Sequence, residues 1–294
     1  MESVLHSIGL RNTPNSPCVF TGCIAPNTAP LYVGLYVDDF CYFSENDEVE
    51  ALFRQALEKH FTLTWEHELD WFLGIRFHWK TDDNGLVTKC HLSQEAFIQD
   101  LLAQTHLLSC NTSPRATPFR RRLPVDTITD KLDLNDSCLY TQQRTKSFQE
   151  IMGCLNWLSI STRPDITTIV TLLASHQAKP LQGHLNAALH VVRYLASTLD
   201  HGITFSYDAD SRLQSFLHFP ILRDILTGFS DSNWGPMDAS KPKASSPSVE
   251  RLPDSFKSIS GSVIMLCNGP VSWGAQRQDL TALSSCEAEI NATR

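Results

Sequence analysis

The stretch LYVGLYVDDFCYF, residues 31–43, consists of two runs of apolar and β-forming residues around a central pair of aspartates. Two such runs on either side of a short polar segment predict a strand, a tight turn and a second strand. Asp38 and Asp39 are therefore expected at the tip of a β-hairpin. Neighbouring carboxylates in that position are able to bind a divalent cation, but Asp-Asp pairs are also common in solvated turns that bind nothing.

A helix is predicted directly after this hairpin. From Asn46 to about His60 the apolar residues follow the i, i+3, i+4 spacing of a helix with one buried face. Ser44 and Asn46 are both available as its N-cap, since their side chains accept hydrogen bonds from backbone N–H groups at a helix start.

A second hairpin is predicted after this helix. Residues 71–79 alternate strictly and predict one strand, and a turn at 82–85 leads into another strand over 86–92. Ser93 is expected to cap the helix that follows. The predicted order of elements is therefore strand, strand, helix, strand, strand, helix.

The middle of the chain begins with a stretch that contains several prolines and arginines. Residues 113–140 show little apolar periodicity, which predicts a domain boundary or a long connection. Helical stripes of apolar residues follow within 148–158 and 185–195, and Pro164 is placed to open a helix between them at its first position. A short strand is expected at 203–207.

The last segment predicts a small sheet and a helix. A strand is expected through residues 226–231, then a loop rich in proline and serine over 235–257, and then a hairpin around residues 268–269. A helix is expected to start at Ser284, because Ser284 and Glu287 have the spacing of a capping box.

The composition indicates a globular chain. Of the 294 residues, 42% are hydrophobic and 19% are charged, so a sizeable core can form. The nine cysteines form no C-x-x-C pair, which argues against a zinc knuckle or a disulfide framework and favours a reducing, intracellular setting. No apolar run approaches the ~20 residues that cross a bilayer, and no signal-peptide pattern is seen. We therefore expect an intracellular, cytoplasmic protein without a membrane segment.

The charge balance argues mildly against a surface that binds nucleic acid everywhere, because the formal net charge is −8. One local exception is a run of arginines without an intervening acid: Arg115, Arg120, Arg121 and Arg122. These side chains are candidates for contacts with nucleic-acid phosphates. The alternative is that the run is a solvated linker, as isolated charge runs commonly are.

Several blocks of sequence resemble those of a known family. Tyr36-Val37-Asp38-Asp39 resembles the Y-x-D-D sequence of reverse transcriptases. Further blocks stand in the order found in copia-type retrotransposon polymerases: WFLGI at 71–75, HLSQ at 91–94, MGCLNWL at 152–158 and TRPDI at 162–166. The last two are also explained as amphipathic core and helix capping, so they identify the family without implying catalysis.

The C-terminal blocks are similar to those of the RNase H domain in the same family. They are GFSDSNW at 228–234, SISG at 258–261, VSW at 271–273 and ALSSCEAE at 282–289. By this ordered set the chain is identified as a member of the copia-type LTR retrotransposon Pol polyproteins, within the reverse transcriptase and RNase H region.

The resemblance implies two Mg²⁺-dependent sites. Asp38 and Asp39 would hold metal at the polymerase site, and Asp231 and Glu289 at the RNase H site, where two-metal chemistry acts on phosphates. Glu287 is a rival to Glu289, but the capping box already explains it as the partner of the helix cap. The implied substrates are deoxynucleotides and an RNA/DNA hybrid, and the implied partner is the remainder of the Pol polyprotein.

The fold class we expect is α+β. Residues 1–112 are expected to form the C-terminal part of a reverse transcriptase palm, with an antiparallel sheet and helices. Residues 113–215 are expected to form a mostly helical thumb and connection after a linker, and residues 216–294 the N-terminal part of an RNase H-like domain.

The chain departs from the family in its carboxylates. Reverse transcriptases of this kind use a further Asp on an earlier palm strand, and residues 1–37 contain none. RNase H uses another Asp on a later strand, and no acid follows Glu289. We therefore expect a fragment, truncated at both ends, that is inactive alone. The alternative is a degenerate or co-opted, non-catalytic nucleic-acid-binding protein, and association with a particle or the nucleus stays open.

Overall fold

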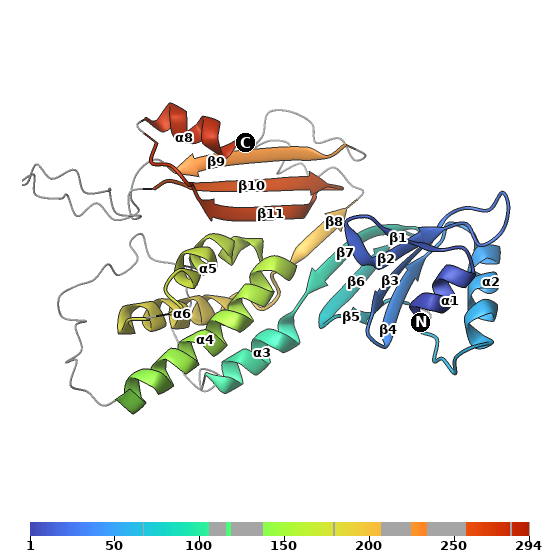
Figure 1. Ribbon diagram of the computed structural model, residues 1–294, viewed down its shortest axis with the longest axis horizontal. Helices are drawn as coiled ribbons and strands as arrows, with labels where there is room; N and C mark the ends of the chain where they lie inside the picture. Colours follow the sequence, from blue (N-terminus) through green and yellow to red (C-terminus); the bar gives the residue numbers. More distant parts are fainter. Residues whose placement is uncertain are drawn as a thin grey trace, which may run out of the picture. The chain divides into compact units, whose positions relative to one another are not determined.

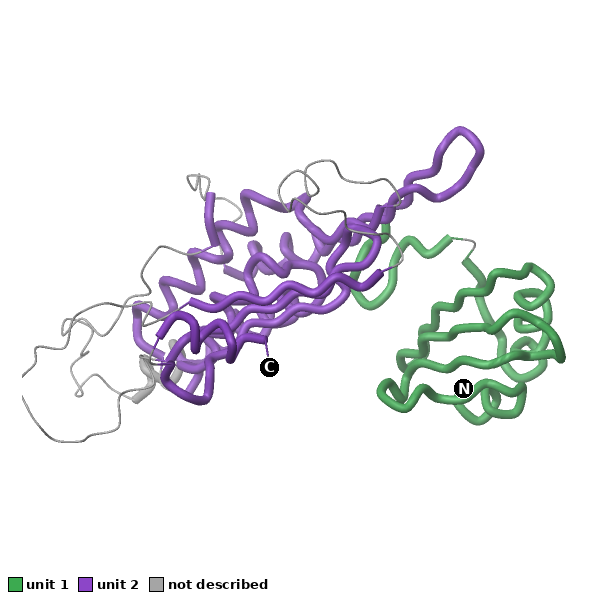
Figure 2. Tube along the Cα trace, turned by 90° about the horizontal axis from the view of Figure 1, so that it is seen from above, with its two compact units in different colours: residues 1–77 green, residues 78–294 purple. Residues whose placement is uncertain are grey.

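The computed structural model describes residues 1–66, 68–105, 116–118, 138–178, 180–206, 225–233, 257–282 and 284–293. Helices and antiparallel sheets alternate along the chain, so the fold is of the α+β class (Figure 1). The chain divides into two compact units, Met1–Phe77 and His78–Arg294 (Figure 2). The domain boundaries predicted at 112/113 and 215/216 fall outside the described residues.

The first unit is a four-stranded antiparallel sheet with two helices. The strand order is β1-β2-β3-β4. The elements are α1 (Glu2–Ser7), β1 (Arg11–Thr13), β2 (Ser16–Gly22), β3 (Leu31–Tyr36), β4 (Asp39–Phe43) and α2 (Asp47–Glu58). Apolar residues of α1, β2, β3 and α2 form one core cluster between the helices and one face of the sheet. The hairpin predicted around the aspartate pair is confirmed as β3 and β4.

The helix predicted after that hairpin is confirmed as α2. Its N-cap is Asn46, whose side-chain oxygen accepts a hydrogen bond from the backbone N–H of Glu48 at 2.7 Å. Val49, Phe53 and Leu57 follow the helical spacing and are fully buried. Burial of this stripe fixes α2 against the sheet that carries the aspartates.

The single strand predicted over residues 71–79 is wrong. The structure breaks it into β5 (Trp71–Phe72) and β6 (Ile75–Thr81), which pair in antiparallel fashion with Phe72 opposite Ile75. Leu73 and Gly74 both have positive φ, 54° and 73°, and form the turn between the strands. A two-residue turn preserves the period of two along the sequence, so alternation alone does not separate a hairpin from one long strand.

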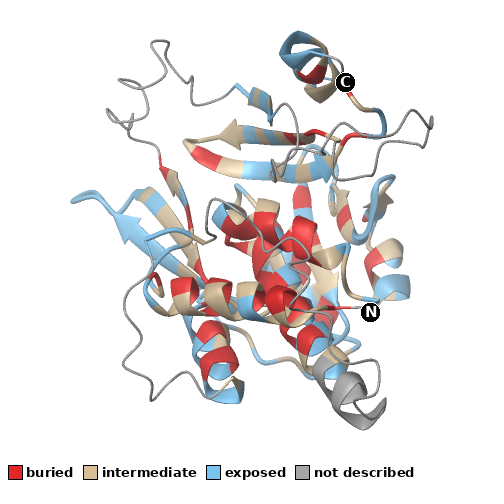
Figure 3. Cartoon of the chain, turned by 90° about the vertical axis from the view of Figure 1, so that its left-hand side faces the viewer, coloured by how far each residue is buried: buried red, intermediate tan, exposed pale blue. Residues whose placement is uncertain are grey.

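The second unit contains a helical region between two sheets. The helical elements are α3 (Glu95–Gln104), α4 (Cys138–Ser161), the 3-10 turn η2 (Pro164–Ile166), α5 (Thr167–Ala174) and α6 (Gln182–Ala196). Their apolar side chains form the largest core cluster (Figure 3). The predicted stripe within 148–158 is buried, with Phe148, Leu155 and Leu158 at 0% exposure. Pro164 stands at the first position of η2, as predicted.

The strands that precede and follow the helical region in the sequence pair with each other. β7 (Val87–Ser93) precedes the helices and β8 (Ile203–Ser206) follows them, and they are antiparallel neighbours with Leu92 opposite Ile203. The sheet order is β5-β6-β7-β8. Gly202, just before β8, allows this approach, because a Cβ there would lie 2.0 Å from the backbone oxygen of Leu92.

The predicted capping role of Ser93 is wrong. Ser93 ends β7 and is buried, and its hydroxyl bonds the Nε2 of His78 at 3.2 Å. Gln94 is the N-cap of α3, without a capping bond from its side chain. β7 therefore includes Ser93, and the helix cap lies one residue later than the preference of serine for N-cap positions predicts.

The third sheet has the order β11-β10-β9, formed by β9 (Thr227–Asn233), β10 (Ile259–Leu266) and β11 (Gly269–Arg277). The turn between β10 and β11 consists of Cys267 and Asn268, both with positive φ, one residue earlier than the predicted position. The helix α8 (Ser285–Ala292) follows, and Ser284 is its N-cap as predicted. In the parts of the chain that the structure describes, no helix has the length and apolar character needed to cross a membrane.

Candidate functional site

The aspartate pair lies at the exposed tip of the β3–β4 hairpin. Tyr36 and Asp39 are paired across the strands, so Val37 and Asp38 form a two-residue turn. Both carboxylates are exposed. Strand pairing of Leu35 with Phe40 brings the chain into this turn and fixes the spacing of the two aspartates.

Val37 holds the turn in a strained backbone conformation. Its φ is 53°, which is unfavourable for a β-branched residue because Cβ crowds the following carbonyl oxygen. Such a conformation costs on the order of 1–3 kcal/mol and persists where surrounding structure enforces it. The Val37 side chain is 78% exposed, so no core packing offsets the strain at the turn itself. Strain at an exposed carboxylate pair supports a functional role for the turn.

Asp39 belongs to the open face of the first sheet. Residues paired across antiparallel strands point to the same face, so Asp39 shares a face with Tyr36, and Tyr32 with Phe43. Tyr32, Tyr36 and Phe43 are 47%, 55% and 58% exposed. The opposite face packs on the core with α2. A flat aromatic surface therefore lies beside the carboxylates.

Asp231 lies on the outer strand of the third sheet. It is exposed, and it is paired with Gly261 of β10. The neighbouring residue Ser232 is paired with Ser260 and points to the other face. The Asp231 carboxylate therefore extends into solvent from the centre of β9.

Glu289 lies on α8, the helix that packs beside β9 (Figure 1). Its side chain is exposed, whereas Ala288 is fully buried. The backbone N–H of Glu287 donates to the hydroxyl of Ser284 at 3.1 Å, which is the cap bond expected from the sequence. The cap by Ser284 is confirmed, whereas the assignment of metal binding to Glu289 stays a prediction.

The contacts of Gln278 fix where α8 rests on the sheet. Its amide nitrogen donates to the hydroxyl of Ser260 at 2.9 Å and to the backbone oxygen of Ala288 at 2.8 Å. The helix is therefore anchored on the face that carries Ser260. Asp231 belongs to the other face of β9, so the register places Asp231 on the face of the sheet opposite to the one on which α8, the helix that carries Glu289, is anchored.

The arginine run predicted to contact phosphates, Arg115, Arg120, Arg121 and Arg122, lies outside the described residues.

Arg163 of the TRPDI block is a buried charge with a complete set of partners. It is 1% exposed, and it donates to both carboxylate oxygens of Asp165 at 3.0 and 2.8 Å. It also donates to the backbone oxygen of Thr198 at 2.9 Å and to its hydroxyl at 2.7 Å. Arg163 is the N-cap residue of η2 but makes no side-chain capping bond; its hydrogen bonds instead connect η2 to Thr198, just beyond the end of α6. The sequence signal was the Arg-Pro-Asp spacing, which sets the two charges two residues apart.

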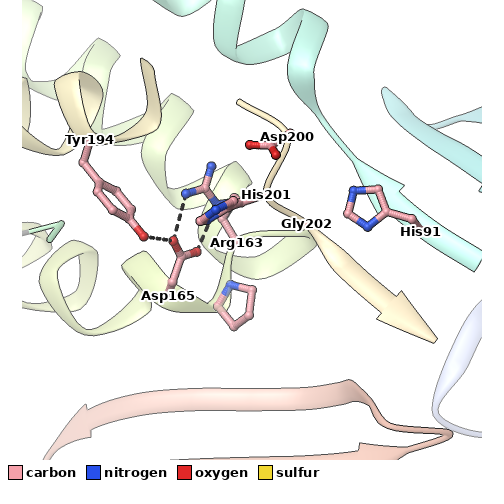
Figure 4. Close-up of a pocket in the computed structure, with 8 residues that line it drawn as sticks. His91, Arg163, Asp165, Tyr194, Asp200, His201 and Gly202 are labelled. Carbon is pink, nitrogen blue, oxygen red and sulfur yellow. Dashed lines mark hydrogen bonds and ion pairs between the residues drawn. The ribbon is translucent and has the colours of Figure 1, made fainter. Parts of the chain in front are cut away.

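The pKa of Asp165 is lowered. Burial by itself raises the pKa of this carboxyl, but the hydrogen bonds from Arg163 and Tyr194 and the Arg163 charge outweigh it. The hydroxyl of Tyr194 donates to Asp165 at 2.7 Å, as Figure 4 shows. Asp165 therefore stays ionised and hydrogen-bonded to Arg163 and Tyr194, as in a structural ion pair, and is not available as a general base.

A hollow of about 360 Å³ opens beside this ion pair. Its lining residues are His91, Arg163, Pro164, Asp165, Tyr194, Asp200, His201 and Gly202 (Figure 4). Burial lowers the pKa of His91, and the nearby His78 lowers it further. The four carboxylates predicted from the sequence are not among the lining residues, so this hollow and the candidate metal sites are separate.

The donor sets fit Mg²⁺ in chemical type. Asp38 with Asp39, and Asp231 with Glu289, offer hard carboxylate oxygens on exposed surfaces, which magnesium prefers. In the described ranges, no group of three or more His, Cys, Asp or Glu side chains is placed to hold a metal ion. The β3–β4 turn places Asp38 and Asp39 next to each other, whereas Asp231 and the helix that carries Glu289 lie on opposite faces of the third sheet.

Comparisons with known proteins place the chain among transposon proteins. It is 28% and 27% identical to the retrovirus-related Pol polyproteins from transposons RE2 and RE1 of Arabidopsis thaliana, over 292 residues in each case. It is 23% identical over 296 residues to the one from transposon TNT 1-94 of Nicotiana tabacum. The chain matches no protein-family model, and no solved structure is significantly similar to it.

These alignments cover 99% of this chain but 17% of the RE2 and RE1 polyproteins and 19% of the TNT 1-94 polyprotein. The chain thus spans less than a fifth of the length of each of these three polyproteins. Because the similarity extends through both structural units, the homologues of this chain are copia-type retrotransposon Pol polyproteins, and the chain resembles a portion of one.

Proposed function

We propose that the chain is a portion of an RNA-directed DNA polymerase with an RNase H domain, from the Pol polyprotein of a copia-type retrotransposon. The observation that carries this proposal is the strained, exposed Asp38-Asp39 turn beside an open aromatic sheet face. A carboxylate pair held rigidly at a hairpin tip can approach a primer end without interference from neighbouring chain. The similarity of nearly the whole chain to copia-type Pol polyproteins supports this proposal.

Asp38 and Asp39 would hold Mg²⁺ at the polymerase site. When bound there, the metal would supply charge stabilisation for the in-line attack of a primer hydroxyl on a nucleotide phosphate. The chain's own contribution is the fixed turn, which keeps the two carboxylates in place before substrate binds. Tyr36 and Phe43 on the same face would stack against bases or sugars of the bound duplex.

Asp231 and Glu289 would hold Mg²⁺ at the RNase H site. The central position of Asp231 on β9 and the anchoring of α8 by Gln278 set the positions from which the two side chains act. The substrate there would be the RNA strand of an RNA/DNA hybrid, and the metal would act on its scissile phosphate.

The chain by itself is proposed to have no appreciable polymerase or nuclease activity. Two carboxylates at each site leave much of the transition-state charge uncompensated, and such electrostatic stabilisation is usually the largest catalytic contribution. Partners from the rest of the Pol polyprotein would complete both sites. Primer extension and hybrid cleavage with the chain alone test this point, and robust synthesis or cleavage would contradict it.

Metal binding at the hairpin can be measured without catalysis. Mn²⁺ titrated into the chain and followed by electron paramagnetic resonance should show bound ions at both candidate sites, and the double variant Asp38→Asn/Asp39→Asn should lose the ions bound at the hairpin while keeping the others. The matched control is Asp82→Asn/Asp83→Asn, a second Asp-Asp pair in a hairpin turn.

In this control pair the Asp82 carboxylate already accepts hydrogen bonds from the backbone N–H groups of Asn84 and Leu86 at 2.9 Å. The control should therefore bind Mn²⁺ as the unmodified chain does. Unchanged Mn²⁺ binding in the Asp38→Asn/Asp39→Asn variant would overturn the assignment of the polymerase site.

The second candidate is a non-catalytic nucleic-acid-binding protein. It is favoured by the two-carboxylate donor sets together with the exposed aromatic face of the first sheet. Fluorescence anisotropy with a labelled RNA/DNA hybrid separates the two functions. Binding that is equally tight in Mg²⁺ and in EDTA, and that survives substitution of Asp38 and Asp39, supports the binding protein, whereas metal-dependent binding supports the polymerase.

A further inference from the structure

One tryptophan of the third sheet forms a hydrogen bond with the helical region. The indole Nε1–H of Trp273, on β11, donates to the backbone oxygen of Ser159 at 2.7 Å. The two residues are 114 positions apart in the sequence. Trp273 is half-buried, and β11 is the strand of its sheet that packs against α5. An indole has one donor and no acceptor, so this bond satisfies the polar requirement of the side chain.

The position of Ser159 makes this contact specific. Ser159 lies in the last turn of α4, where backbone oxygens have no partner within the helix. Its oxygen also accepts a hydrogen bond from the hydroxyl of Thr167 at the start of α5, at 3.1 Å. Trp273 and Thr167 therefore both donate hydrogen bonds to a backbone oxygen in the last turn of α4. The third sheet thus supplies one of the groups that cap this helix.

A second contact holds the other end of the same hairpin. The backbone N–H of Ser206, at the end of β8, donates to the oxygen of Cys267, at 2.8 Å. The side-chain amide of Asn268 donates back to the oxygen of Ser206 at 3.1 Å. Gly269 rests against the ring of Phe205, where a Cβ would lie 2.5 Å from a ring carbon. The β10–β11 turn is thus fastened to β8.

The face fastened by Trp273 is the face that carries Asp231. In the register of the sheet, Trp273 is opposite Val263, and Val263 is opposite Phe229. Asp231 is two residues beyond Phe229 on β9, so its side chain points to the same face. This face is in contact with the helical region at β11 and is open at Asp231.

We propose that Trp273 and Asn268 are positioning residues that hold the sheet bearing Asp231 at a fixed place relative to helices α4 to α6. Trp273 sets the inclination of the sheet on the helices, and Asn268 prevents it from turning about that contact. A role of Trp273 and Asn268 in nucleic-acid cleavage rests on the proposed function of Asp231 as a metal-binding residue. The mechanical coupling itself requires neither metal nor nucleic acid.

The coupling can be measured as a distance within the full chain. Nitroxide labels are placed on exposed positions of the two parts, Glu150 on α4 and Ser262 on β10, through unnatural amino acids because the chain has nine cysteines. Double electron–electron resonance should give one narrow distance distribution for the unmodified chain. The double variant Trp273→Phe/Asn268→Gly should give a distribution at least twice as broad.

The substitutions are chosen to keep the fold. Phenylalanine retains an aromatic ring without the donor, and glycine adopts the φ of 61° that Asn268 has. Trp71→Phe, at a 48% exposed tryptophan of the first unit, is the control and should leave the distribution narrow. A merely stabilising role would lower the melting temperature without broadening the distance at a temperature where the helical circular dichroism is intact.

An unchanged, narrow distribution in the folded double variant would overturn the proposal. If the double variant loses its helical circular dichroism, the single variants Trp273→Phe and Asn268→Gly are measured in the same way. A broad distribution in either supports the coupling, and narrow distributions in both overturn it. Because the measurement contains no metal or substrate, its outcome is independent of the Mn²⁺ titration that tests the proposed function.

Discussion

The guanidinium of Arg163 donates two parallel hydrogen bonds to the carboxylate of Asp165, and it does so from a position that is 1% exposed. Loss of either partner is costly, because Arg163 is buried and Asp165 keeps only 33% of its side-chain exposure, so water compensates the remaining charge only in part. This pair also ties η2 to the end of α6 through Thr198. The helical region therefore depends on the pair being complete.

Arg163→Ala should destabilise the second unit by about 3–5 kcal/mol, since it removes one partner of a buried, hydrogen-bonded pair. Urea unfolding monitored by circular dichroism measures this change. The control is Lys146→Ala, which breaks the pair with Glu150 at 3.9 Å, where both side chains are more than half exposed. Solvent screens that pair, so its loss should cost under about 1 kcal/mol. Equal effects of the two variants would contradict the structural role of Arg163.

Acid should destabilise the second unit through His91. The pKa of His91 is lowered from 6.5, chiefly by burial and also by His78, so the folded chain favours the neutral ring. Above pH 6.5 the ring is neutral in both states and the stability is complete. As the pH falls below 6.5 the unfolded chain binds the proton first, and stability decreases until the folded ring is also protonated.

The free energy of unfolding, measured between pH 7.5 and about 5, should therefore fall less steeply in His91→Gln than in the unmodified chain. His60→Gln, at an exposed position of the first unit, serves as the control and should keep the full decrease. The same slope in all three chains would show that His91 does not contribute.

The sequence predicted the parts of the fold that depend on local chemistry. The aspartate hairpin, the Asn46 cap and the Ser284 cap follow from residues within a few positions of each other. The pairing of β7 with β8 did not follow, because the two strands are separated by the whole helical region and no local pattern links them. α1, β1 and β2 were not predicted either, although β2 supplies the neighbour of β3.

Local patterns were also insufficient at buried polar residues. Ser93 has the preference of a helix cap, but its side chain is used inside the sheet by His78. The sequence does not predict that Arg163 is buried, because its contacts are with Tyr194 of α6 and with Thr198 just beyond that helix, 35 residues away. For the carboxylate sites, the sequence gives the residues and the structure gives the faces on which they lie.

Val37→Asn should stabilise the first unit by about 1 kcal/mol. Asparagine adopts positive φ more easily than a β-branched residue, so the strain at the turn decreases. The control is Val87→Asn at the start of β7, where a half-exposed valine has no such backbone and a strand prefers the branched side chain. That substitution should destabilise the chain slightly. Urea unfolding of both variants measures the difference, and a loss of stability in Val37→Asn would contradict the strain.

Gly202→Ala should disrupt the pairing of β7 with β8. The added Cβ would lie 2.0 Å from the backbone oxygen of Leu92 and 3.0 Å from a ring carbon of His91, and a backbone atom cannot rotate away. Inserting one methyl group into a packed site typically lowers the free energy of unfolding by roughly 1–3 kcal/mol. Hydrogen exchange of the β8 amides should therefore become faster than in the unmodified chain.

The matched control is Gly153→Ala in the middle of α4, where no atom apart from the chain neighbours and the surrounding helix backbone lies within 4 Å of the added Cβ. Alanine in a helix interior is favoured over glycine by roughly 0.5–1 kcal/mol, so this variant should be more stable. The two substitutions add the same methyl group and should have opposite signs. If Gly202→Ala leaves both the stability and the exchange of β8 unchanged, the strands that enclose the helical region are not in the contact that the structure describes.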